Sequence, residues 1–285
     1  MNDNKNIGVV FLMWIPYGLN VFREFLNSYC TYSAGIQHEF LIVFKDRGSN
    51  KEEELKCRQL LSEKDIKYEG VYFDGGLDLD AYFFAAMNRS WEYVFFLNTK
   101  SILLYDDWLL KMYSIVKRDD VGMVSATGSW QSHRSTVFYA LQWRYERGKS
   151  FGENFTKYKM LLKATFYYPF LFRSFPNPHL RTNAFLIKRS LFLTMRWKAL
   201  NSKFRAYLCE SGRNSITNQV IRAGFLTLIV DKEGKEFEIA KWPDSKTFWI
   251  SEQENLLIAD KQTELYKNAD IQYKRYLSYV GWGRR

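Results

Sequence analysis

One short apolar run limits the possible folds more than any other part of this 285-residue chain. Tyr93–Leu97 is uninterrupted by polar residues, which is typical of a strand covered on both faces at the centre of a parallel α/β sheet. The run stops at a polar tip, Asn98–Ser101. Because ligands of such sheets bind beyond the carboxyl ends of the strands, this tip predicts the floor of a binding site.

Strands and helices alternate over roughly the first 125 residues. Apolar runs predict strands at 7–14, 40–44, 68–73, 93–97 and 121–125, and helical spacing predicts helices at 19–33, 51–64 and 77–88. A further helix is expected from Trp108, with Asp106 and Asp107 as its N-cap and first turn. This alternation predicts an α/β fold with a mostly parallel sheet flanked by helices.

The segment Trp130–Phe175 has a different composition. It carries eight basic and two acidic residues, hence +6 of the net charge of +10, interleaved with many aromatics. Two helices are expected here, over 135–147 and 154–168. Such helices suit an anionic membrane surface, but they also suit a helical lid with an aromatic core and solvated lysines. Single-stranded nucleic acid is a less favoured partner, because no recognised nucleic-acid module accompanies the basic residues.

The remaining segments are shorter. A strand is expected over 179–188, a helix over 190–200, a polar turn over 209–213, a helix over 215–223 and a last strand over 225–230. Residues 242–285 are expected to form a C-terminal extension that packs on a domain of residues 1–241. Within this extension, 266–285 is amphipathic and basic.

Charge and cysteine content bear on location. The net charge of +10 predicts an anionic partner. The cysteines are three, widely spaced and without a C-x-x-C pair, which favours reduced thiols in the cytoplasm over a disulfide framework or a zinc site. The first apolar run ends in a Pro-Tyr-Gly turn, so we expect a strand and not a signal peptide. A cytoplasmic protein that works at the inner face of the membrane fits these features.

Taken in order, several motifs resemble the GT-A-fold glycosyltransferases, especially bacterial enzymes of capsule and O-antigen assembly. Asp46 follows the second strand, as does the family's acidic nucleotide contact, and residues 74–82, DGGLDLDAY, resemble its segment over the nucleotide. The tip at Asn98 lies where the family's D-x-D motif would fall. Glu210 precedes a helix where the family places its catalytic carboxylate, and residues 251–257 resemble a C-terminal segment of such enzymes. The resemblance covers residues 7–230.

The resemblance implies transfer of a sugar from a nucleotide-sugar donor to a glycan or lipid-linked acceptor. Glu210 would be the general base of an inverting reaction; the alternative for Glu210 is a helix-cap carboxylate. His179 would contact the acceptor. The nucleotide would lie across the first four strand tips, against Trp14, Asp46, Asp78 and Asn98.

One departure from the family concerns the metal. The D-x-D carboxylates normally bind Mg²⁺ or Mn²⁺ across the diphosphate, because hard cations prefer oxygen ligands. Here the tip reads Asn98-Thr99-Lys100, in which two side chains offer neutral oxygens and the third is a cation. A metal-independent enzyme is therefore favoured, with Lys100, Arg181 and Arg213 as the diphosphate ligands. The lost carboxylates also leave a second reading open, in which a catalytically inactive domain binds a glycan or a membrane within an assembly complex.

Overall fold

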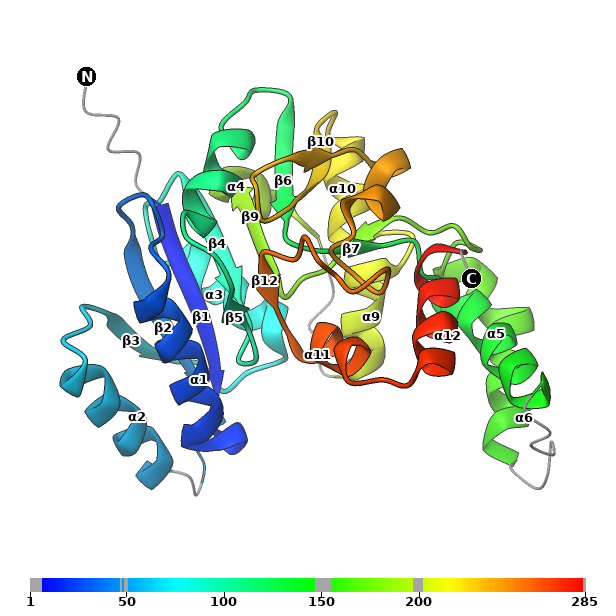
Figure 1. The fold of residues 1–285 in the computed structure, drawn as a ribbon, viewed down its shortest axis with the longest axis horizontal. Coiled ribbons are helices and arrows are strands. Elements are labelled where there is room, and N and C mark those ends of the chain that lie inside the picture. The colour runs from blue at the N-terminus through cyan, green and yellow to red at the C-terminus, as the bar shows by residue number, and fades with distance from the viewer. Residues whose placement is uncertain (1–6, 47, 49–50, 147–154, 197–201, 284–285) are drawn as a thin grey trace.

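A computed structural model describes residues 7–46, 48, 51–146, 155–196 and 202–283 (Figure 1). Its centre is an eight-stranded sheet in the order β11-β10-β6-β9-β4-β1-β2-β3. Within it β9 runs antiparallel to β4 and β6, and β11 antiparallel to β10, whereas the other pairs are parallel. The strands are β1 Ile7–Trp14, β2 Glu39–Lys45, β3 Glu69–Tyr72, β4 Tyr93–Leu97, β6 Val121–Ser125, β9 Ala184–Lys188, β10 Leu226–Val230 and β11 Glu236–Phe237. The predicted α/β class is confirmed.

Helices cover both faces of the sheet. Alternate residues of β1 explain the two layers: Val9 and Phe11 pack in one buried cluster, and Val10 and Leu12 pack in the other. The first cluster takes in residues of α1 (Gly18–Thr31), α2 (Lys51–Glu63) and α4 (Trp108–Val116), and the second takes in residues of α3 (Asp78–Met87), α8 (Arg189–Thr194) and α10 (Ile216–Arg222).

Strand β4 has the central position that its composition predicts. Phe95 lies 5.5 Å from the Trp108 ring on one face, and Phe96 stacks 4.6 Å from the Tyr82 ring on the other. All five residues of β4 are buried. Burying both faces of one short strand explains why no polar residue interrupts it.

The acidic pair before α4 has a different role from the one expected. The helix begins at Trp108, but Asp107 at its N-cap has φ +58° and makes no side-chain capping hydrogen bond. Asp106 Oδ1 instead accepts from Ser33 N at 2.7 Å, and Asp107 N donates to Ser33 O. The predicted helix start at Trp108 is confirmed, with Asp107 at the N-cap position, but the expected capping hydrogen bond is absent. Asp106 and Asp107 instead fasten the start of α4 to Ser33, just after α1.

The basic aromatic segment is helical. Helix α5 spans His133–Glu146; α6 (Phe155–Leu162) continues through a π-helical turn, η2 (Lys163–Tyr167), into α7 (Tyr168–Leu171). The predicted helices agree with these positions, although residues 147–154, which include a predicted helix end and start, lie outside the described residues. Figure 1 shows α5 and α6 at the end of the molecule furthest from α2.

Three local predictions between 179 and 223 were inaccurate. The expected strand 179–188 is two strands, β8 (His179–Leu180) and β9, because β8 leaves the main sheet to pair with β7 (Gly128–Ser129). Helix α8 ends at Thr194, since Met195 is extended; residues 197–200 lie outside the described residues. Glu210 lies in the last turn of α9 (Lys203–Ser211) and not in a turn ahead of a helix.

Residues after 238 pack across the carboxyl edge of the sheet. They contain η3 (Ile239–Ser245), β12 (Ile258–Ala259), α11 (Lys261–Lys267) and α12 (Ile271–Trp282). Strand β12 pairs with β5 (Ile102–Leu103), directly after the β4 tip, and Leu257 and Ile258 join the buried cluster of α1 and α4. Figure 1 shows α12 beside α5. Among the described helices, none is both long and apolar enough to cross a bilayer.

Candidate functional site

The tips of β1, β2 and β4 come together at one edge of the sheet. Trp14 Nε1 donates to Asp46 Oδ2 at 3.2 Å, and Trp14 N donates to Thr99 Oγ1 at 3.0 Å. Asp46 has φ +60°, and its backbone N donates to Asp74 Oδ1. The structure thus brings together the predicted nucleotide contacts Trp14 and Asp46.

The β4 tip is held by its own hydrogen bonds. Asn98 Oδ1 accepts from Lys100 N at 3.1 Å and from Ser101 Oγ at 3.2 Å. Thr99 is buried, and its Oγ1 donates to Leu12 O at 2.7 Å while accepting from Trp14 N. The neutral side-chain oxygens of Asn98, Thr99 and Ser101 are therefore all engaged within the fold.

These residues do not fit a divalent cation. Mg²⁺ and Mn²⁺ sites are built from carboxylate and free carbonyl oxygens, whereas the tip offers three engaged neutral oxygens and the Lys100 ammonium. Nor does any cluster of three His, Cys, Asp or Glu side chains with ligand geometry occur elsewhere in the described part of the chain.

Lys100 lies over an aromatic ring of the β1 tip. Its Nζ is 4.7 Å from the Tyr17 ring centroid, and Tyr17 contacts the Trp14 ring edge-on at 4.6 Å. A cation–π contact orients the ammonium while leaving its donors available. The Lys100 charge thus stands beside the predicted nucleotide contacts.

Asp78 links this edge to Glu210. Although the Asp78 side chain keeps contact with solvent, the surrounding protein raises its pKa; the Lys45 ammonium opposes this rise and the Glu210 carboxylate adds to it. That mutual influence places Asp78 near Glu210. Asp80, by contrast, accepts from Leu77 N and serves the start of α3.

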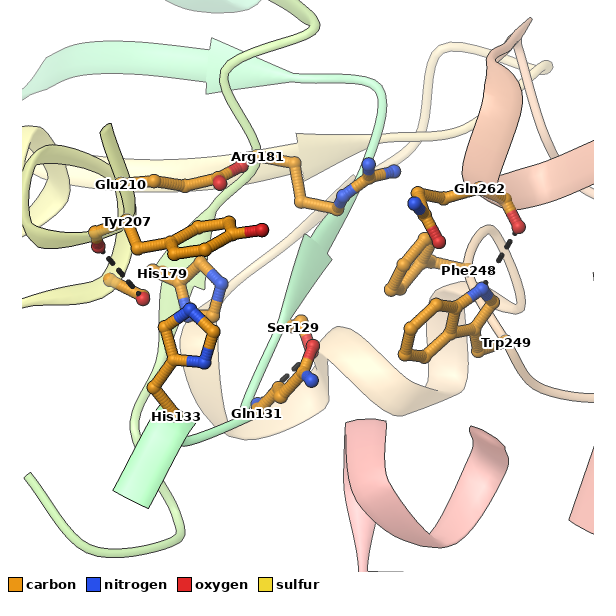
Figure 2. Close-up of a pocket in the computed structure, with 11 residues that line it drawn as sticks. Ser129, Gln131, His133, His179, Arg181, Tyr207, Glu210, Phe248, Trp249 and Gln262 are labelled. Atoms are coloured by element: carbon orange, nitrogen blue, oxygen red, sulfur yellow. Dashed lines mark hydrogen bonds between the residues drawn. The ribbon is translucent and has the colours of Figure 1, made fainter. Parts of the chain in front are cut away.

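Glu210 lines a cavity of about 220 Å³ at the carboxyl edge (Figure 2). Its Oε1 accepts from Thr182 N at 3.3 Å, and Asn183 O, one residue on, accepts from Asn98 N. One loop between β8 and β9 therefore holds both Glu210 and the β4 tip. The alternative of a favourable helix-start cap is wrong, because the carboxylate lies at the helix end where the macrodipole disfavours it.

Two histidines lie beside Glu210. His179 Nδ1 contacts Asn177 O at 2.9 Å, and the His133 ring meets the Tyr207 ring edge-on at 4.2 Å. Burial lowers the pKa of both histidines, and the Glu210 carboxylate opposes that lowering. Figure 2 shows both rings beneath Tyr207. Neutral imidazoles next to a carboxylate offer donors and acceptors to sugar hydroxyls.

Arg181 lines the cavity between Glu210 on one side and Gln262 on the other (Figure 2). Its Nη2 lies 2.9 Å from Asp260 Oδ2, and its guanidinium lies 4.4 Å from the Phe248 ring centroid. The Arg181 side chain is 12% exposed, and its Nη1 has no hydrogen-bond partner among the described residues. A buried unpaired donor costs free energy unless a ligand satisfies it.

The structure does not bring Arg213 to this cavity. Its backbone N donates to Leu171 O and its Nε donates to Pro169 O at 3.1 Å, so it contacts α7. A phosphate role for Arg213 at the β4 tip has no geometric support, because its guanidinium is directed to α7.

Sequence reasoning missed much of the cavity wall. His133, Tyr207, Phe248, Trp249 and Gln262 all line it. Trp249 Nε1 donates to Gln262 O, and the Phe248 and Trp249 rings stack at 4.5 Å. Residues 251–257, which resemble a C-terminal segment of the family, do not line the cavity themselves; Phe248 and Trp249, just before them, form its wall opposite Glu210.

No protein-family model and no curated protein matches the chain. Solved structures do. A mannosyltransferase from Pyrobaculum calidifontis in complex with GDP-Man and Mn²⁺ aligns with a TM-score of 0.50 at 12% identity, over 96% of this chain and 69% of that one. Glucosyl-3-phosphoglycerate synthase from Mycobacterium tuberculosis aligns at 0.38 and 12% identity, over 69% and 60%; Staphylococcus aureus TarS 1–349 aligns at 0.33 and 13%, over 42% and 34%. The chain thus spans less than two thirds of the synthase and of TarS. At 12% identity the likeness to the mannosyltransferase shows the fold alone, which is of the GT-A type.

Proposed function

We propose that the protein is a glycosyltransferase that moves a sugar from a nucleotide-sugar donor to a hydroxyl of a glycan or lipid-linked glycan. The observation that carries the proposal is the cavity in which the Glu210 carboxylate and the Arg181 guanidinium share one space. The β8–β9 loop joins Glu210 to the β4 tip through Thr182 and Asn183. A fold likeness to a mannosyltransferase solved with GDP-Man supports the donor class.

Glu210 is the proposed general base. It takes the proton of the acceptor hydroxyl as that oxygen attacks the anomeric carbon, while the bond from that carbon to the diphosphate oxygen breaks and the nucleoside diphosphate keeps the electron pair. A single displacement of this kind inverts the anomeric configuration. The hydrogen bond from Thr182 N fixes the carboxylate without occupying both of its oxygens.

Two cations are proposed to stabilise the departing diphosphate. Lys100 stands over Tyr17 at the nucleotide side, and Arg181 presents its unpaired Nη1 at the acceptor side. Fixed donors aimed at developing negative charge stabilise a transition state, as a metal does in related folds. The composition of the β4 tip supports a transfer that needs no metal ion.

The acceptor is proposed to be reached at the inner face of a membrane. The turn η2 and helix α7 expose two large rings, Phe166 at 69% and Phe170 at 77%. Apolar side chains exposed to this extent among lysines suit insertion into an anionic lipid surface. Surface polysaccharide assembly, in which acceptors are carried on lipid, is the proposed context.

Titration calorimetry tests the donor proposal. With GDP and UDP as probes and no added metal, we expect one nucleoside diphosphate to bind. A domain that has lost catalysis and only binds a glycan or membrane, the alternative left by the missing carboxylates, would give no heat with any nucleoside diphosphate, and that result would refute the proposal.

A further inference from the structure

A second cavity lies on the other side of α9 from Glu210. Its volume is about 440 Å³, and it is lined by side chains of α7, α9 and their neighbours: Tyr167, Leu171, Arg196, Phe204, Arg205, Leu208, Cys209 and Asn214. On α9, Tyr207, Glu210 and Ser211 line the first cavity, and Phe204, Leu208 and Cys209 line the second. One helix therefore forms a wall of both spaces.

The lining of the second cavity is apolar with a basic rim. Phe204 packs against Tyr167 at 6.5 Å and Tyr168 at 5.9 Å. Burial raises the pKa of the Cys209 thiol to about 11, so this group stays neutral at physiological pH. Arg196 and Arg205 are the charged lining residues, and Glu210 is the only acidic residue between positions 155 and 223. Such a lining suits a ligand with an apolar chain and an anionic end.

The cavity opens next to the exposed rings of the basic aromatic segment. Tyr167 is 51% exposed and also lines the cavity. Phe166, which is 69% exposed, precedes it directly. The cavity and the exposed rings therefore adjoin at Tyr167.

We propose that the cavity between α7 and α9 binds the lipid-phosphate carrier of the acceptor, with the apolar chain against Phe204 and Leu208 and the phosphate at Arg196 and Arg205. Arginine suits this role, because its planar guanidinium pairs with phosphate oxygens. Helix α9, about 10 Å across with its side chains, separates the proposed lipid site from the cavity of Glu210. The assignment of the ligand as a carrier rests on the proposed transfer reaction; the test below does not.

Binding of farnesyl phosphate to the full chain, measured by calorimetry without any nucleotide, tests the site. Farnesol and inorganic phosphate each carry half of the required chemistry, so we expect both to bind at least roughly tenfold more weakly. Arg205→Gln is expected to weaken farnesyl phosphate roughly tenfold through loss of a charged hydrogen bond, and Leu208→Trp to abolish binding by filling the cavity. Arg275→Gln, an exposed arginine on α12, is the matched control and should bind as the parent does.

Two results would overturn the proposal: unchanged farnesyl phosphate binding in Arg205→Gln, which alters only a rim side chain, or equal binding of short-chain phosphatidylglycerol, which would make the site one for bulk phospholipid. Failure of the donor proposal is seen separately, since nucleoside diphosphates would then not bind while farnesyl phosphate still would.

Discussion

The Arg181 guanidinium and the Asp260 carboxylate form an ion pair at 2.9 Å that joins the β8–β9 loop to the N-cap of α11. Asp260 is 2% exposed, and its Oδ1 also accepts from Gln262 N and Thr263 N. The pair engages Nη2 of Arg181 and leaves Nη1 for a ligand. It therefore couples the cavity to the C-terminal extension.

Asp260→Asn is expected to destabilise the protein by about 3 kcal/mol, because removing one partner leaves a buried charge unpaired. Denaturant unfolding measures this change. Glu254→Gln, which removes an exposed pair with Lys246, is the control and should cost under about 1 kcal/mol. An equal decrease in the free energy of unfolding in the two variants would show that the buried pair contributes no more than the exposed one.

Glu210→Gln is expected to lower the rate of sugar transfer at least roughly 100-fold while nucleoside diphosphate affinity stays unchanged, because only proton transfer is lost. Product formation and calorimetry give the two readouts. Glu238→Gln, exposed after β11, is the matched control. Normal turnover in Glu210→Gln would remove its role as base.

Lys100→Gln is expected to weaken nucleoside diphosphate binding roughly tenfold and to affect a nucleoside less, because the lost contact is to phosphate. Lys261→Gln on α11 serves for comparison. Transfer by the parent protein should persist in excess EDTA. Strict loss of activity with the chelator, restored by Mn²⁺, would contradict the metal-independent mechanism.

Stability is expected to fall as the pH is lowered from 7.5 to 5.5. Burial lowers the pKa of His38, His133 and His179 below the ordinary value of 6.5, so the unfolded chain binds more protons in this window. Asp78, whose pKa burial raises above its ordinary value of 3.8, acts in the opposite direction, but it is one group against three histidines. Thermal unfolding across the window measures the slope, and a melting temperature that rises on acidification would contradict it.

Phe166→Ser with Phe170→Ser is expected to reduce sedimentation with vesicles that contain phosphatidylglycerol, because both rings lose their apolar contact with lipid. Leu55→Ser with Ile271→Ser removes side chains exposed to 65% and 64% on α2 and α12 and should leave sedimentation unchanged. If the parent protein stays in the supernatant, the membrane proposal fails.

Much of the fold could be predicted because its signals are local. The unbroken apolar run of β4 required cover on both faces. Over the first 125 residues, apolar runs alternate with stretches of helical spacing, and each is recognisable from neighbouring residues alone. The direction of β9 was not predictable from Ala184–Lys188, because an apolar strand reads the same in either direction. Helix α9 was not predicted, because its residues show little helical periodicity of apolar side chains.

Of the candidate site, the sequence predicted the strand tips but not the wall formed by residues after 238. Trp14, Asp46 and the β4 tip follow strands, so the sheet rule placed them together. Phe248, Trp249 and Gln262 come from a segment whose position depends on the β5–β12 pairing and on the Arg181–Asp260 pair, contacts between residues far apart in sequence. No local pattern encodes such contacts.

The pairing of β12 with β5 also has a consequence for biosynthesis. The ribosome adds Phe248, Trp249 and Asp260 after every strand of the eight-stranded sheet has been made. The nascent chain can therefore form its nucleotide edge while the wall opposite Glu210 is still missing. Sugar transfer would then become possible only late in synthesis. A partly made chain would bind a donor without transferring its sugar.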